Sequence, residues 1–346
     1  MISLNTAPTL HHYLKFIIAM KKIFFLLAVL IQLFIVASAQ TDNSKIQEAT
    51  GHPTGVIENL QTIKKSLNFL VMGDWGRHGE QHQRNVAQQM SNATVGLKAT
   101  FNLIVGDNFY PDGVMSVFDP SWQSSFENVY TQHPLYDDWY VVLGNHDYRT
   151  NPDAEVAYSK ISARWIMPSR YYSVLKKLDD GGGTAEFFFI DTSPFQTDYY
   201  GSEEYGANVK GVDTAAQKKW LEDGLKNSTA TWKFVIGHHP LYSAGGRKGK
   251  TGDMLNSFGP LFEKYQVDAY FCGHEHVLEY DQPAEYHFVE VISGAGSEAT
   301  PVTTAPYAKF AMQDFGFVAA SLTSKELLIQ YINENGKILY TTSVNK

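Results

Sequence analysis

The sequence predicts an α/β fold of the α+β kind: a four-layer αββα sandwich in which two mixed β-sheets are flanked by helices. Two observations support this prediction. Between residues 67 and 272, apolar stretches typical of strands alternate with more polar stretches typical of helices. From about His287 onward, the pattern indicates three or four further strands, with a hairpin turn at residues 333–336. No repeat or linker divides residues 67–346, so we expect a single domain over this range.

The expected elements follow from hydrophobic periodicity and from the residues at their ends. Strands are expected where apolar residues precede a glycine, over residues 68–72, 101–105, 139–143, 234–236 and 269–272. A pair of strands, 171–174 and 185–190, is expected around the turn at 179–183. Helices are expected over residues 80–97, 119–130, 154–161, 214–226 and 254–265. Asp119, followed by Pro120, and Asp213 are suitable N-caps.

Residues 1–39 have the pattern of a secretory signal peptide. Two lysines precede an apolar run over residues 23–36, and Ala37-Ser38-Ala39 supplies the small residues of a cleavage site. A transmembrane anchor is the alternative, but the run is shorter than the roughly 20 apolar residues that span a bilayer. We therefore expect cleavage after Ala39, a secreted or periplasmic protein, and no stable membrane anchor after cleavage.

Met20 is the natural start of the signal peptide, which makes residues 1–19 an upstream extension. After cleavage, the mature chain is expected to start with a flexible lead-in over residues 40–66.

The formal net charge of −8 argues against nucleic acid as the main partner, because nucleic-acid binding depends on neutralising phosphates with lysine and arginine. Cys272 is the single cysteine, so no internal disulfide can form, which suits a bacterial exported protein.

Residues with metal-binding side chains follow five of the expected strands. The motifs are GDWG (73–76), GDNFY (106–110), GNHD (144–147), VIGHH (235–239) and GHEH (273–276). The candidate metal ligands in them are Asp74, Asp107, Tyr110, Asn145, His238, His274 and His276. In open α/β sheets, ligands bind at the carboxyl ends of strands, so we expect these loops to meet.

Each of these residues alone has an ordinary structural explanation. A single aspartate after a strand is most often a turn former or a helix cap, and a single buried histidine is most often just hydrogen-bonded. Caps and turns do not account for all five strand ends in one chain. Aspartate, asparagine and histidine around a central carboxylate suit two metal ions a few Å apart, bridged by that carboxylate. The set therefore predicts a dinuclear metal site.

The five motifs, in this order, resemble the motif blocks of the purple acid phosphatases, within the calcineurin-like metallophosphoesterase superfamily. The segment over residues 139–172 is similar to the small, tartrate-resistant branch of that family, and the resemblance covers roughly residues 68–320. It implies a ferric ion and a second, divalent ion, which is Fe²⁺, Zn²⁺ or Mn²⁺. The implied ligands are Asp74, Tyr110 and His276 for Fe³⁺, Asn145, His238 and His274 for the second ion, and Asp107 as the bridge.

Gly76 and Tyr110 separate this chain from most of the superfamily. Most members carry Asp-x-His in the first block, whereas here Gly76 stands in place of the histidine. Tyr110 can replace that ligand with a phenolate. An anionic, hard oxygen donor favours a trivalent ion, in line with the general preference of oxygen ligands for hard cations.

On this resemblance we expect an acid phosphatase that hydrolyses phosphate monoesters by attack of a metal-bound hydroxide. The expected substrates are small phosphorylated molecules, with phosphoproteins as a second class. His146 is expected to be the catalytic residue that hydrogen-bonds the substrate or protonates the leaving group, with Asp147 orienting it. A structural role for His146 is the alternative.

One departure from the family concerns the leaving group. In the relatives a further active-site histidine follows the VIGH block, but here that stretch reads HPLYSAGGRKGK. His239, Arg247 or Lys248 is left to supply the missing positive charge or proton. Residues 192–213, which show no clear period, are long enough to overhang the metals and limit access.

Other functions fit the same residues. A phosphodiesterase or a nucleotide hydrolase would use the same site. A non-catalytic binding protein would keep the fold, although the complete ligand set argues against it. An Fe²⁺/Fe³⁺ pair would also permit a redox role. The sequence indicates no oligomeric state.

Overall fold

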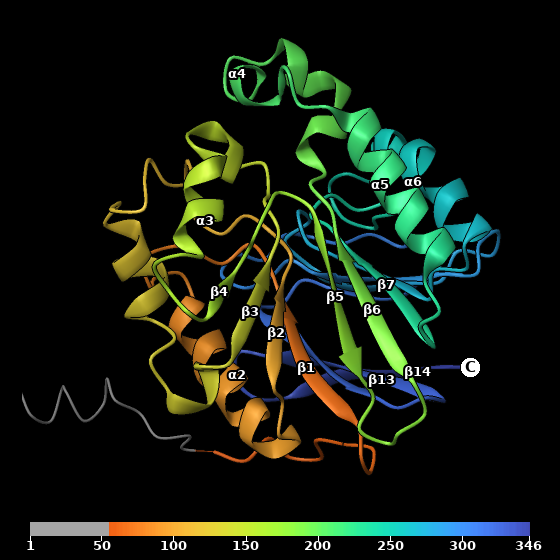
Figure 1. Ribbon diagram of the computed structural model, residues 1–346. Helices are drawn as coiled ribbons and strands as arrows, with labels where there is room; N and C mark the ends of the chain where they lie inside the picture. The colour runs from red at the N-terminus through yellow and green to blue at the C-terminus, as the bar shows by residue number, and fades with distance from the viewer. Residues whose placement is uncertain (1–54) are drawn as a thin grey trace, which may run out of the picture. The chain divides into compact units, whose positions relative to one another are not determined.

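The computed structural model describes residues 55–346, which fall in one compact unit (Figure 1). The predicted signal peptide over residues 1–39 and most of the predicted lead-in lie outside the described residues. The described end of the lead-in packs on the domain: the side chain of Ile57 is buried, and the backbone N–H of Gln61 donates to the side chain of Gln330 over 2.9 Å. Among residues 55–346, no helix is both long and apolar enough to cross a membrane.

Within residues 55–346, fourteen strands form two sheets, and both sheets are mixed, as the sequence predicts. The strands of the first sheet are β1 (Leu67–Met72), β2 (Phe101–Ile104), β3 (Asp138–Val141), β4 (Trp165–Ile166), β12 (Gly316–Leu322), β13 (Glu326–Asn333) and β14 (Ile338–Asn345). Those of the second sheet are β5 (Tyr172–Lys177), β6 (Thr184–Phe189), β7 (Trp232–Ile236), β8 (Ala269–Cys272), β9 (Leu278–Asp281), β10 (Val289–Ser293) and β11 (Ala308–Met312).

The parallel strands form one side of the first sheet and the centre of the second. The first sheet has the order β14-β13-β12-β1-β2-β3-β4, and β1 to β4 run parallel. The second has the order β11-β9-β10-β8-β7-β6-β5, and β6, β7, β8 and β10 run parallel. The sheets pack face to face, because the ring of Phe69 on β1 lies 5.7 Å from that of Phe187 on β6 and 6.0 Å from that of Phe271 on β8.

Helices cover the outer faces of the two sheets (Figure 1). The α-helices are α2 (Gln83–Leu97), α3 (Pro152–Tyr158), α4 (Gly206–Val209), α5 (Thr214–Asn227) and α6 (Gly252–Lys264). Helix α2 contacts β1, β12 and β13, whereas α5 and α6 share an apolar cluster with β7, β8 and β10. Helix α5 begins where the sequence predicts, because the side chain of Asp213 accepts a hydrogen bond from the N–H of Ala216 over 2.9 Å.

Three expected elements differ from the structure. In place of an α-helix over residues 119–130 there is a π-helical segment, η1 (Trp122–Glu127), whose Trp122 and Phe126 rings pack 4.9 and 5.1 Å from that of Trp165. Tertiary packing here outweighs helix propensity. Residues 192–213 contain short helical turns, η4 (Ser193–Phe195), η5 (Thr197–Gly201) and α4. The chain after residue 287 forms five strands, β10 to β14. Two further short turns are η2 (His133–Leu135) and η3 (Asp147–Arg149).

Strands β9 and β10 bury three acidic side chains. Glu279, Asp281 and Glu290 are each 0% exposed. The carboxylate of Glu290 accepts hydrogen bonds from the N–H groups of Leu241 and Tyr242, at 2.7 and 2.9 Å, whereas no donor among the described residues reaches either oxygen of Asp281. Burial raises the pKa of Asp281, and the negative charges of Glu279 and Glu290 raise it further. The folded protein therefore favours a protonated Asp281.

Replacing Asp281 with asparagine should stabilise the protein more at neutral than at acidic pH. The folded state holds the Asp281 proton above the pH at which the unfolded chain releases it, so the wild type loses stability as pH rises through that window, by about 1.4 kcal/mol per pH unit for one proton. Asparagine stays neutral and removes this loss. Urea unfolding at about pH 5 and about pH 8 should show the gap between variant and wild type widening by about 2 to 4 kcal/mol. A constant gap would contradict the prediction.

Candidate metal centre

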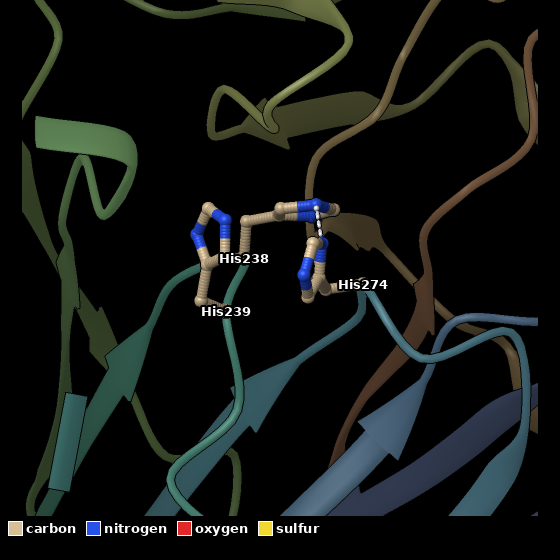
Figure 2. Close-up of side chains that lie close together, drawn as sticks. All are labelled: His238, His239 and His274. Atoms are coloured by element: carbon tan, nitrogen blue, oxygen red, sulfur yellow. Dashed lines mark hydrogen bonds between the residues drawn. The ribbon is translucent and has the colours of Figure 1, made fainter. Parts of the chain in front are cut away.

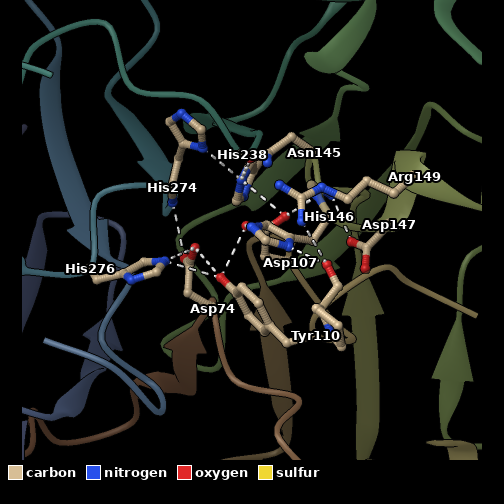
Figure 3. Close-up of polar contacts among 12 residues, drawn as sticks. Asp74, Asp107, Tyr110, Asn145, His146, Asp147, Arg149, His238, His274 and His276 are labelled. Atoms are coloured by element: carbon tan, nitrogen blue, oxygen red, sulfur yellow. Dashed lines mark hydrogen bonds and ion pairs between the residues drawn. The ribbon is translucent and has the colours of Figure 1, made fainter. Parts of the chain in front are cut away.

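Five loops meet at one edge of the two sheets, at the carboxyl ends of β1, β2, β3, β7 and β8 (Figure 3). Backbone hydrogen bonds join them: the N–H of Asp74 donates to the carbonyl of Gly106, and the N–H of Gly273 to the carbonyl of His238, both over 3.0 Å. The structure brings together all the ligands that the sequence predicts, which are Asp74, Asp107, Tyr110, Asn145, His238, His274 and His276. Their binding of metals stays a prediction.

Asp74, Tyr110 and His276 form one group of side chains, the Tyr110 group. The hydroxyl of Tyr110 lies 3.1 Å from Oδ1 of Asp74 and 3.1 Å from Nε2 of His276. Nε2 of His276 lies 3.4 Å from the same oxygen of Asp74. The three atoms therefore converge closely enough to share one cation.

Asn145, His238 and His274 form a second group, the His238 group. Nε2 of His238 lies 3.2 Å from Oδ1 of Asn145 and 3.1 Å from Nδ1 of His274. Nδ1 of His238 faces the carbonyl of Val105 at 2.8 Å, so this nitrogen carries a hydrogen and Nε2 points into the group. One amide oxygen and two imidazole nitrogens suit a divalent ion.

The carboxylate of Asp107 lies between the two groups. Its Oδ2 is 3.0 Å from the hydroxyl of Tyr110, and its Oδ1 is 3.4 Å from Nε2 of His238. Asp107 is only 1% exposed. A buried carboxylate whose two oxygens face two different sets of ligand atoms has the placement that a bridging ligand needs.

The pKa shifts of Asp107 and His238 indicate that the buried carboxylate of Asp107 requires a positive charge beside it. Burial alone would raise the pKa of Asp107, but the charges and hydrogen bonds of His238 and His146 lower it far below its usual value. Burial alone would lower the pKa of His238, but the charge of Asp107 raises it to about 9. In the metal-free protein a protonated His238 thus balances Asp107, and a metal ion would displace that proton. The residues present therefore fit a cation at this place.

Tyr110 is a neutral phenol in the same surroundings. Burial raises the pKa of Tyr110 well above its usual value, and the charges of Asp107 and Asp74 raise it further. The guanidinium carbon of Arg77 lies 3.7 Å from the centre of the tyrosine ring. Because two carboxylates already surround the hydroxyl, removing its proton requires a strongly charged cation. This fits a trivalent better than a divalent ion.

Three of the predicted ligands have a left-handed backbone. The φ angle is 58° at Asp74, 49° at Asp107 and 68° at His274. Residues other than glycine adopt this region at a cost of about 1 to 3 kcal/mol each, and such strain is concentrated at functional sites. Each of the three follows a glycine, at the point where the strand ends and the side chain turns toward the site.

A buried polar network behind the site holds two of the loops. The carboxylate of Asp147 accepts hydrogen bonds from the backbone N–H groups of Asn108, Phe109 and Gly144, at 3.0, 3.1 and 2.8 Å. The expectation that Asp147 orients His146 is therefore wrong, because its oxygens fix the loops after β2 and β3. Sequence reasoning missed Asn108, although it stands inside the GDNFY motif.

A second support lies behind His276. Nδ1 of His276 is 3.4 Å from the carboxylate of Glu298, which also pairs with Arg77. Nε of Arg77 donates to the hydroxyl of Ser297 over 3.2 Å. These contacts direct Nε2 of His276 toward Tyr110. No motif marks Glu298, because only the fold brings it to Arg77.

His146 lies at the rim of the site, where 19% of its side chain is exposed. Its backbone N–H donates to Oδ1 of Asp107 over 2.8 Å, and its ring lies 4.3 Å from that of Tyr110. Nδ1 is hydrogen-bonded to the carbonyl of Pro111, which leaves Nε2 available, 4.0 Å from Oδ2 of Asp107. A partly exposed nitrogen beside the predicted metals is well placed to contact a substrate.

His239 packs beside His274, with ring centres 4.2 Å apart (Figure 2). One ligand atom each of His238, His239 and His274 lies within 4.8 Å of the others, so these three could also hold a metal. However, both ring nitrogens of His239 are hydrogen-bonded, Nδ1 to Thr192 at 2.8 Å and Nε2 to Tyr199 at 2.9 Å. Burial lowers the pKa of His239 well below its usual value, as does the charge of His238. His239 is therefore a neutral, packed residue that is ill suited to donate a proton.

Residues 193–209 lie against the site. The hydroxyl of Tyr205 accepts hydrogen bonds from Nδ2 of Asn145, over 3.2 Å, and from Nη2 of Arg149, over 3.0 Å. The bond to Nδ2 turns the amide so that its Oδ1 faces His238. That this segment limits access to the site stays a prediction.

The loop that holds Gly76 approaches the loop after β2 very closely. A Cβ atom at residue 76 would lie 1.8 Å from the carbonyl oxygen of Asn108. The carbonyl of Gly76 also accepts the N–H of Tyr110 over 2.9 Å. The close contact between these two loops positions Tyr110 and leaves no room for a side chain at residue 76. The glycine at residue 76 and the tyrosine at residue 110 therefore belong to one structural arrangement.

Known proteins resemble this chain over most of its length. Residues 67–278 match the family model described as calcineurin-like phosphoesterase. Purple acid phosphatase 7 of Arabidopsis thaliana is 34% identical over 312 residues, which cover 84% of this chain and 92% of that protein. Tartrate-resistant acid phosphatase type 5 of Oryctolagus cuniculus is 34% identical over 302 residues, which cover 81% of this chain and 91% of that protein.

Solved structures share the fold. GAP50, described as the anchor in the inner membrane complex of Plasmodium, superposes with a TM-score of 0.71 at 24% identity, over 82% of this chain and 89% of that one. Purple acid phosphatase PPD1 from yellow lupin (Lupinus luteus) seeds superposes with a TM-score of 0.56 at 17% identity, over 82% of this chain and 54% of that one.

Replacing Gly76 with alanine should destabilise the protein, because the new methyl group meets the backbone of Asn108. Overpacking of this kind costs about 1 to 3 kcal/mol. Chemical denaturation should show this loss in the free energy of unfolding. Gly201→Ala is the matched control, since a Cβ there meets nothing within 4 Å. An equal effect of the two substitutions would contradict the steric explanation.

Replacing Tyr205 with phenylalanine should weaken binding of the second metal, because the amide of Asn145 loses the hydroxyl that orients it. Loss of such a supporting bond typically costs about 10- to 100-fold in metal affinity. Metal content after dialysis against a graded chelator measures the effect. Tyr200→Phe serves as the control, since its hydroxyl donates to the carbonyl of Pro194. The same metal affinity in both variants would rule out this role for Tyr205.

Proposed function

Since the chain belongs to the calcineurin-like phosphoesterase family and, within it, to the purple acid phosphatases, we propose that it is an acid phosphatase that hydrolyses phosphate monoesters at a dinuclear Fe³⁺–M²⁺ site. The placement of Asp107, with one oxygen toward each group of ligands, carries the proposal. We also propose a secreted or periplasmic location, which rests on the signal peptide expected over residues 1–39, outside the described residues.

Each side chain of the site has a role in this proposal. Asp74, Tyr110 and His276 would hold the ferric ion, Asn145, His238 and His274 the divalent ion, and Asp107 both. When bound, the two ions neutralise charge on the phosphate and activate the attacking water. The protein orients its ligands beforehand, through Tyr205 on Asn145 and Glu298 on His276.

Tyr110 supports iron as the trivalent metal. Its phenol keeps its proton against Asp74 and Asp107 unless a strongly charged cation displaces it. Arg77, over the ring, favours the resulting phenolate. The second ion is proposed to be Fe²⁺, Zn²⁺ or Mn²⁺, because two imidazoles and one amide oxygen suit each of them.

His146 is the proposed proton donor to the leaving group. The carbonyl of Pro111 fixes one ring nitrogen, and the other lies at the exposed rim. The imidazole of a histidine can transfer a proton to a leaving group through such an accessible nitrogen. Small phosphorylated molecules, and phosphoproteins as a second class, are the proposed substrates.

The purified protein should be coloured, and replacing Tyr110 with phenylalanine should remove the colour. A phenolate bound to Fe³⁺ gives a charge-transfer band in the visible range, and phenylalanine cannot form it. A visible spectrum together with metal analysis of protein purified without added metal measures both. A colourless, iron-free and active protein would sink the ferric assignment.

The same preparations test the reaction. At acidic pH, the wild-type protein should hydrolyse the monoester phenyl phosphate faster than the diester bis(4-nitrophenyl) phosphate. A faster rate on the diester would favour the phosphodiesterase alternative. Bound metals without turnover of either ester would favour a non-catalytic binding protein.

A further inference from the structure

Three arginines surround the site, and they differ in how far their donors are occupied. Arg77 lies over Tyr110 and pairs with Glu298, and 18% of its side chain is exposed. Both Nη atoms of Arg149 are hydrogen-bonded, one of them to the hydroxyl of Tyr205, and 22% of its side chain is exposed. The side chain of Arg247 is 45% exposed. Arg247 is therefore the most accessible of the three.

One edge of the Arg247 guanidinium is anchored. Nη1 donates to Oε1 of Glu275 over 2.6 Å and to the carbonyl of His274 over 3.3 Å. Glu275 itself is buried. Among residues 55–346, Nε and Nη2 of Arg247 have no hydrogen-bond acceptor. The opposite edge of the planar group is thus free to bind an anion.

The contacts of Arg247 place it at the loop that carries two of the predicted ligands. Its Nη1 reaches the backbone carbonyl of His274, a residue of the His238 group, and the carboxylate of Glu275, which stands between His274 and His276 in the chain. Arg247 therefore lies beside the predicted metals and not at a remote part of the surface.

The loop before Arg247 is fixed by buried acids of the second sheet. Glu290 accepts the N–H groups of Leu241 and Tyr242, and Glu279 accepts that of Ala244 over 2.7 Å. Residue 247 therefore has a defined position relative to the ends of β7 and β8.

Lys248, the next cation in the chain, is hydrogen-bonded to the carbonyl of Thr304. His239, another residue that could replace the missing histidine, has both ring nitrogens hydrogen-bonded, one to Thr192 and the other to Tyr199. Of the three residues, Arg247 alone combines a free donor edge with a place beside the metals.

We propose that Arg247 binds the non-bridging oxygens of the substrate's phosphoryl group and of the phosphate product, without donating a proton. This proposal rests on the proposed function. A guanidinium remains protonated at any working pH, and two parallel N–H groups match two oxygens of a phosphate. Because Arg247 and His239 are then excluded as acids, His146 is left as the proposed donor of a proton to the leaving group.

The first test measures binding of inorganic phosphate to the metal-loaded protein by titration calorimetry. Arg247→Ala should weaken binding about 10- to 100-fold, the usual effect of losing charged hydrogen bonds, and Arg247→Lys should fall between it and the wild type. Lys248→Ala is the matched control and should leave binding within about twofold. If Arg247→Ala binds phosphate as tightly as the wild type does, with the same metal content and the same free energy of unfolding, the proposal is overturned.

The second test separates phosphate binding from proton donation. Arg247→Ala should lower kcat/KM for phenyl phosphate and for an alkyl phosphate by the same factor, because a group that holds the phosphoryl oxygens does not sense the leaving group. His146→Ala should lower it more for the alkyl ester, whose leaving group needs a proton more. A larger loss on the alkyl ester in Arg247→Ala would overturn the proposal by showing that Arg247 acts on the leaving group.

Glu275 is a positioning residue in this arrangement. Glu275→Gln should weaken phosphate binding in the wild type but have no further effect in Arg247→Ala, since it acts through the guanidinium. Equal effects in both backgrounds would contradict that role. If the wild type binds phosphate without hydrolysing esters, the proposed function fails while Arg247 is still tested. If the wild type is active and Arg247→Ala binds phosphate equally well, only the Arg247 proposal fails.

Discussion

The carboxylate of Asp107 is the interaction on which the rest of the site depends. It is buried between two groups of side chains that come from both sheets, and one oxygen serves each group. A buried carboxylate is costly unless it is paired, so positive charge has to accompany it. In the metal-free protein His238 supplies that charge. Two cations would satisfy Asp107 and free His238 to act as a neutral ligand, which is the physical reason to expect metals here.

The fold supports this arrangement with features that are unfavourable by themselves. Three ligand residues have left-handed backbones, and Asp147 uses its carboxylate to fix backbone N–H groups of the loops after β2 and β3. Burial and the negative charge of Asp107 together raise the pKa of Asp147 to about 7. Because the parallel strands of both sheets end at the same edge of the sandwich, the strained loops that follow them are adjacent, and the large apolar core compensates for their cost.

The three arginines around the predicted metal site differ in how far their side chains are already paired. Arg77 stacks on Tyr110 and is paired with Glu298, which suits a role in stabilising a phenolate. Nη2 of Arg149 already donates a hydrogen bond to the hydroxyl of Tyr205. Arg247 keeps one edge free. A phosphate between the predicted metal ions and Arg247 would meet cations on two sides, with His146 at the exposed rim of the site.

The sequence by itself determined the α/β class, the five strand ends and the seven candidate ligands, because strands ending in a glycine and a polar residue form a local pattern. It also identified the cap of α5, where Asp213 needs only its own helix. The sequence did not reveal the roles of Asn108, Glu298 and Tyr205, nor the π-helical turn at Trp122–Glu127, since each depends on residues far away in the chain. Only the tertiary structure decided that Gly76 has no room for a side chain, that His239 is already fully hydrogen-bonded, and that Arg247 has a free edge. These are facts of distance between separate loops, and a linear pattern does not contain such distances.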